Sequence, residues 1–139
     1  MLAGAVFFAV SLLGFHAIAA IWPDASNHAS QVYAWLDEIE SWLLLIPLVA
    51  FIIVSEEAIW RGAVMLPLAA KLGAWKGVVV SAMLFALAHV FLGPPILVFA
   101  AFVAGCFWGW LAIKTRGLFA PIVCHLLWDG LVMFVWPLV

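Results

Sequence analysis

Long apolar stretches, separated by short polar connections, run through nearly the whole of this chain. They cover about residues 2–22, 42–70, 77–92, 96–113 and 118–136. Of the 139 residues, 70% are hydrophobic and only 9% are charged, which is more apolar surface than one soluble core of this size can bury. Lipid must cover the excess. The sequence therefore predicts an all-α, polytopic transmembrane helix bundle with about five spanning helices.

The spans leave no room for a second folding unit. A spanning helix uses about 20 residues, so we predict that positions 1–139 form a single membrane domain. The two cysteines, Cys106 and Cys124, lie in apolar stretches without CxxC or Cys/His spacing, so we expect neither a disulfide framework nor a thiolate metal site. The formal net charge is -2 and no basic run occurs, which argues against nucleic acid as a partner.

The basic residues predict how the chain crosses the membrane. Lys71, Lys76, Lys114 and Arg116 occupy two short connections, and the other connections have no lysine or arginine. Because basic loops stay on the cytoplasmic side, we expect the N-terminus inside and the polar stretch 24–41 outside. That stretch is predicted to be a loop or a short interfacial helix.

The second apolar stretch, residues 42–70, is too long for a straight crossing. As one helix it would measure about 43 Å, whereas the hydrocarbon core of a bilayer is about 30 Å thick. We expect it to tilt, kink or protrude, with Pro47, Gly62 and Pro67 as candidate break points.

Three charged residues, Glu56, Glu57 and Arg61, lie inside this stretch. Each costs about 2.5 to 3.5 kcal/mol at the centre of a spanning helix, so they must be paired, neutralised or in contact with a water-filled cavity. Glu57 and Arg61 are i, i+4 neighbours and can form an ion pair along one helix face. Glu56 lies about 100° round the helix and has no local partner.

Three more titratable residues, His89, His125 and Asp129, lie in later spans, and His125 and Asp129 are again i, i+4 neighbours. Counting 1.5 Å per residue from the cytoplasmic ends places these groups and Glu56 at depths of about 12 to 21 Å. Three helices thus bring polar groups to one level near the middle of the membrane.

Two kinds of chemistry fit such a cluster. A buried carboxylate beside histidine can act as a general base on water. Two histidines and two carboxylates can instead bind zinc with one position open, and the ligands would be Glu56, His89, His125 and Asp129. Ligand type alone leaves both open.

A non-enzymatic interpretation also stays open. The cluster would then serve an ion- or proton-handling, transporter-like protein, or an immunity or scaffold protein of the same fold. Geometry separates the alternatives, because an enzyme needs Glu56, His89 and His125 within reach of one water.

In these residues the sequence resembles the CAAX prenyl endopeptidase type II and bacteriocin-processing family of intramembrane endopeptidases. The family pattern is EExxxR, then FxxxH, then HxxxN or HxxxD. Residues 56–61 read EEAIWR, residues 85–89 read FALAH and residues 125–129 read HLLWD. The resemblance extends over about residues 55–135, which would form the catalytic core.

The resemblance implies hydrolysis of a peptide bond in a membrane-associated peptide or protein. Glu56 and His89 would activate water, while His125 and Asp129 would stabilise the oxyanion or orient the groups that do. Supporting roles fall to three residues: Glu57, Arg61 and Phe85, the last packing beneath His89. The implied location is a prokaryotic cytoplasmic membrane, with the lipid bilayer as environment and the oligomeric state open.

One position departs from the better-studied family members, which have asparagine where this chain has Asp129. An ionised aspartate would repel an oxyanion. Asp129 is therefore expected to be protonated, to orient His125 or to bind a metal.

Overall fold

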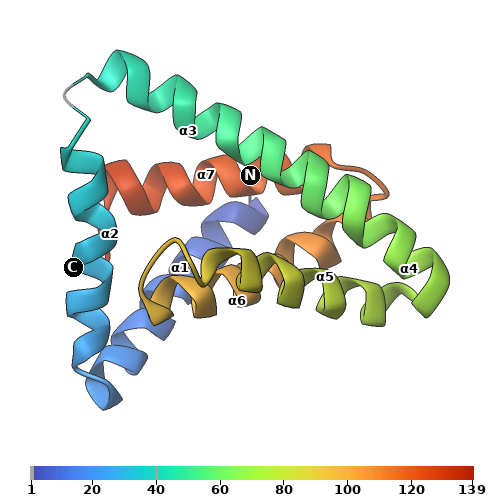
Figure 1. Ribbon diagram of the computed structural model, residues 1–139, viewed down its shortest axis with the longest axis horizontal. Helices are drawn as coiled ribbons and strands as arrows, with labels where there is room; N and C mark the ends of the chain where they lie inside the picture. The colour runs from blue at the N-terminus through green and yellow to red at the C-terminus, as the bar shows by residue number, and fades with distance from the viewer. Residues whose placement is uncertain (1, 40) are drawn as a thin grey trace.

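A computed structural model describes residues 2–39 and 41–139, and the regular structure of these residues is entirely helical (Figure 1). The elements in chain order are α1 (Leu2–Ile21), α2 (Asp24–Asp37), α3 (Trp42–Glu56), η1 (Glu57–Met65), α4 (Leu66–Leu72), α5 (Ala74–His89), α6 (Pro95–Thr115), α7 (Phe119–Gly130) and η2 (Leu131–Val135). The predicted all-α helical bundle is confirmed.

Each of the predicted apolar stretches forms a helix. Three helices are long and apolar enough to cross a membrane: Leu2–Ile21, Trp42–Leu72 and Pro95–Thr115, of 20, 31 and 21 residues. The other two, Ala74–His89 and Phe119–Val135, are apolar but shorter. At 1.5 Å per residue these two helices are only about 24 to 26 Å long. Of the about five predicted spanning helices, three therefore have the full length of a span and two are shorter.

The polar stretch between the first two apolar helices forms the helix α2. Of the two predictions for this stretch, a loop or a short helix, the helix is confirmed. In Figure 1 it runs across the ends of α3 and α7. Its small residues Ala25 and Ala29 are buried and pack with Phe15 of α1 and Ile96 of α6. Because its inner face is apolar and its outer face polar, α2 closes one end of the bundle.

The long helix from Trp42 to Leu72 is continuous, and its irregularity is a π-helix. Pro47 lies inside α3, and Gly62 lies within η1, where the N–H of Leu66 bonds to the carbonyl of Arg61, five residues back. Pro67 follows directly and has no N–H to continue the α-helical bonding, which favours a local change of pattern. None of the candidate break points interrupts the helix.

The bundle buries charged residues while it exposes many large apolar side chains. Glu57 and Arg61 are 0% and 2% exposed, whereas Leu43, Phe91 and Phe119 are 86%, 94% and 82% exposed. A protein in water cannot sustain that distribution, because large apolar side chains at its surface would favour aggregation. The distribution fits a bundle surrounded by lipid.

The middle of α6 packs closely against α5. A Cβ added at Gly105 would lie 3.1 Å from the Cβ of Ala82, and one at Gly109 would lie 3.0 Å from Cγ1 of Val78. Glycine at these two positions therefore lets the helices approach.

Gly105→Val should separate α5 from α6 and lower the free energy of unfolding by about 1 to 3 kcal/mol, because the added atoms overpack this contact. Gly14→Val is the matched control, since a Cβ there meets nothing within 4 Å. Thermal unfolding in detergent measures both. Equal midpoints for the two variants would contradict the prediction.

Candidate active site

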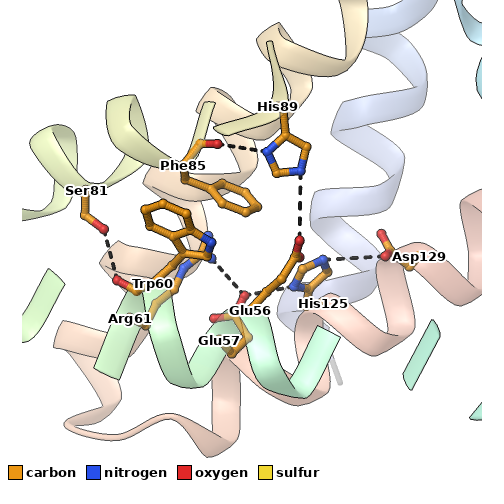
Figure 2. A network of polar contacts seen from close by, with 9 residues as sticks. All are labelled: Glu56, Glu57, Trp60, Arg61, Ser81, Phe85, His89, His125 and Asp129. Carbon is orange, nitrogen blue, oxygen red and sulfur yellow. Dashed lines mark hydrogen bonds and ion pairs between the residues drawn. The ribbon is translucent and has the colours of Figure 1, made fainter. Parts of the chain in front are cut away.

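A polar network lies inside the bundle, where η1, α5 and α7 meet (Figure 2). Its centre is the carboxylate of Glu57, at the start of the π-helix. Oε1 of Glu57 lies 3.1 Å from Nη1 of Arg61, so the structure contains the ion pair that the i, i+4 spacing predicts. Because both side chains are buried, each charge compensates the other where water cannot.

The same carboxylate oxygen also binds His125. Nδ1 of His125 donates a hydrogen bond of 2.8 Å to Oε1 of Glu57, and Nε2 lies 3.5 Å from Oδ2 of Asp129. Each ring nitrogen thus faces a carboxylate. The i, i+4 pair of His125 and Asp129 was expected, whereas the contact with Glu57 joins residues 68 positions apart and has no local signal in the sequence. Glu57 therefore does more than neutralise Arg61, because it also orients His125.

Glu56 points to a different partner. Its Oε1 lies 3.9 Å from Nε2 of His89, which is longer than a direct hydrogen bond. Nδ1 of His89 lies 2.8 Å from the carbonyl oxygen of Phe85. A carbonyl can only accept, so Nδ1 carries the proton, and in the neutral ring Nε2 presents a lone pair towards Glu56.

Exposure separates the two halves of the network. The side chains of Glu56 and His89 are 26% and 13% exposed, whereas those of Glu57 and His125 are 0% and 5% exposed. The first pair is therefore more accessible to a substrate and water than the second.

Aromatic rings enclose the charged groups. Phe85 lies edge-on to His89 with ring centroids 4.5 Å apart, as predicted, and Cζ of Arg61 lies 4.8 Å from the Phe85 centroid. Trp108 of α6 stacks on His125 at 3.5 Å and lies 5.1 Å from Cζ of Arg61. The sequence interpretation assigned Trp108 no place in the site. The one indication in the sequence is its position in the middle of a span, away from the membrane interface that indole rings favour.

The contacts of the four predicted zinc ligands are pairwise. Glu56 pairs with His89, and His125 pairs with Asp129 and Glu57. Among the described residues, no group of three or more His, Cys, Asp or Glu side chains is placed to hold a metal ion. Zinc binding therefore stays a prediction, and the proposed reaction does not use a metal.

Comparison with known protein families matches residues 38–131 to the Rce1-like family, described as type II CAAX prenyl endopeptidase Rce1-like. The chain belongs to this family. The resemblance inferred from the three motifs is thereby confirmed, and all of the predicted site residues of this Rce1-like protein lie within the matched region. Neither the curated proteins nor the solved structures contain a match to the chain.

Family membership and the lipid-facing helices together make the Rce1-like chain an integral membrane protein of an endopeptidase family. A lipid bilayer is its environment, and a peptide is the substrate class that the family implies.

Proposed function

We propose that this Rce1-like protein is an intramembrane endopeptidase that hydrolyses a peptide bond in a membrane-associated peptide or protein, with water activated by Glu56 and His89. The observation that carries the proposal is the 3.9 Å separation of Glu56 Oε1 and His89 Nε2. A water about 2.8 Å from each atom would bridge two acceptors that can both draw on its protons. The pair is also the more exposed part of the network.

The reaction then needs one proton acceptor and one proton donor. The Glu56 carboxylate takes a proton from the water as the oxygen attacks the carbonyl carbon of the scissile bond, while His89 Nε2 orients the water. The tetrahedral intermediate collapses, the C–N bond breaks, and Glu56 returns the proton to the leaving amine. One water is consumed and Glu56 ends in its starting state.

His125 is the proposed partner of the oxyanion. Its Nδ1 is engaged by Glu57 and its Nε2 lies on the side of Asp129. In this scheme the ring carries a proton on each nitrogen, so that Nε2–H can donate to the substrate oxyanion. Asp129 in this scheme orients the ring and balances its positive charge, and it does not itself donate to the oxyanion. Glu57 and Arg61 hold His125 in place from the other side.

Cleavage of a peptide library tests the proposal. The purified protein, in detergent or in liposomes, is incubated with membrane-associated peptides that include prenylated C-terminal cysteine peptides, and mass spectrometry reads the new termini. We expect cleavage at a defined bond. Folded protein that produces no termini beyond those of a protein-free sample would overturn the proposal.

The zinc alternative has a separate test. We expect activity to survive exhaustive chelation and elemental analysis of the purified protein to find zinc well below one ion per chain. Stoichiometric zinc, together with activity that chelation removes and zinc restores, would contradict the metal-free scheme.

We also place the protein in a prokaryotic cytoplasmic membrane with its N-terminus inside. The positive-inside rule supports the orientation, since Lys71, Lys76, Lys114 and Arg116 occupy two connections on the same side of the predicted topology.

A further inference from the structure

Ser81 is a buried hydroxyl on α5, the helix that carries His89. Its residue exposure is 4%, and its Oγ donates a hydrogen bond of 3.0 Å to the carbonyl oxygen of Trp60. Trp60 lies within η1, between Glu57 and Arg61 in the sequence, and Figure 2 shows the bond beside the polar network. The hydroxyl therefore joins α5 to the irregular part of the helix that carries the acidic residues.

The segment that Ser81 contacts is irregular. A π-helix is rare and occurs mostly as a single turn inside an α-helix, frequently at a functional site. A carbonyl oxygen has two lone pairs, so Trp60 can accept from Ser81 in addition to any bond within its own helix. The bond from α5 thus reaches the π-helix at the point where it carries the site.

Ser81 also belongs to a row of contacts. Ser81, Phe85 and His89 are spaced i, i+4, i+8 and share one face of α5. The Phe85 ring packs on the Trp60 ring with centroids 5.5 Å apart, and His89 faces Glu56 at the end of α3. The row therefore aligns α5 with the long helix over about 12 Å, from the Ser81 hydrogen bond to the Glu56–His89 pair.

Within the described part of the chain, the bond from Ser81 is the one side-chain hydrogen bond between α5 and η1. The remaining side-chain contacts of this interface include the packing of the Phe85 ring on Trp60 and on Arg61. Such packing contributes to the register of the two helices, and the hydrogen bond adds a constraint with a narrow range of distance and angle.

We propose that Ser81 is a positioning residue: its hydrogen bond to the Trp60 carbonyl fixes α5 along η1 and so sets the separation of Glu56 and His89. The proposal rests on the function proposed for that pair. A displacement of about 1 Å in a reacting geometry can cost about 100-fold in rate. Loss of the bond should therefore lower turnover without removing any group that touches the substrate.

Three variants test the role of Ser81. Ser81→Ala removes one oxygen, and Ser81→Thr keeps the hydroxyl. Ser30→Ala is the matched control, because the Ser30 hydroxyl donates to the carbonyl of Ser26 at 3.0 Å on the exposed side of α2. For each variant we measure kcat, KM, the thermal unfolding midpoint and the hydrogen exchange of backbone amides 57–65.

We expect Ser81→Ala to lower kcat about 10- to 100-fold with KM unchanged and to accelerate amide exchange in residues 57–65. Ser81→Thr should restore both, and Ser30→Ala should match the wild type. The role is overturned if Ser81→Ala leaves exchange in 57–65 unchanged, or if its kcat falls only with the folded fraction.

The two readouts keep the proposals separate. A wild-type protein without peptidase activity would contradict the proposed function, whereas the exchange measurement would still decide whether Ser81 holds η1. Normal peptidase activity in Ser81→Ala would contradict the positioning role and leave the proposed function intact.

Discussion

Glu56→Gln is expected to abolish detectable peptide hydrolysis while the protein unfolds at its wild-type temperature. Glutamine has the shape of glutamate but cannot take a proton from water, and loss of a general base lowers rates by about 10²- to 10⁴-fold. Stability should change little, because the Glu56 side chain is 26% exposed and its nearest charged partner, Nε2 of His89, is 3.9 Å away. Mass-spectrometric cleavage assays and thermal unfolding in detergent measure the two quantities.

The matched control is Glu38→Gln, the same chemical change at an exposed position after α2. It should leave cleavage at the wild-type rate. Full activity in Glu56→Gln would eliminate Glu56 as the base, and equal loss in the two variants would show that the assay responds to charge alone.

Glu57→Gln, one residue further along, is expected to give the opposite result, with a large loss of stability. Glu57 is 0% exposed, and its Oε1 binds both Arg61 and His125. Removing one partner of a buried ion pair leaves the other charge uncompensated and costs about 3 to 5 kcal/mol. The free energy of unfolding in detergent should therefore fall far more in Glu57→Gln than in Glu56→Gln.

A double variant separates charge balance from shape. Glu57→Leu combined with Arg61→Leu removes both charges, and replacing a buried pair by apolar side chains is often neutral for stability. We expect the double variant to be more stable than either single leucine substitution, while His125 loses its partner and activity falls. Glu57→Gln with wild-type stability, or a double variant as unstable as the sum of the single changes, would contradict the role of Glu57 as the centre of the network.

The two neighbouring glutamates show which side-chain partners can be predicted from local spacing in the sequence. Successive helical residues point about 100° apart, so the sequence predicts different partners for Glu56 and Glu57. It identifies Arg61 for Glu57 and Asp129 for His125, because i, i+4 neighbours share a helix face whatever the fold. The ion pair persists even though the segment is π-helical rather than α-helical.

The sequence alone also predicts the membrane bundle and the clustering of its polar groups, from the apolar stretches and from the cost of charge in a membrane. A chain this apolar must place its helices in lipid, and expensive polar groups at a common depth must come together or be neutralised. The helical bundle and the family follow from these patterns and from the three motifs, and both are confirmed.

Tertiary structure alone decided which polar groups meet across helices. The hydrogen bond from His125 to Glu57, the stacking of Trp108 on His125 and the bond from Ser81 to Trp60 each join residues distant in the chain. Their geometry depends on how the helices pack, including the close approach of α5 and α6 at Gly105. Helix periodicity determines the face on which a side chain lies, but not which face of another helix it meets, because packing angles and register depend on all the contacting side chains together.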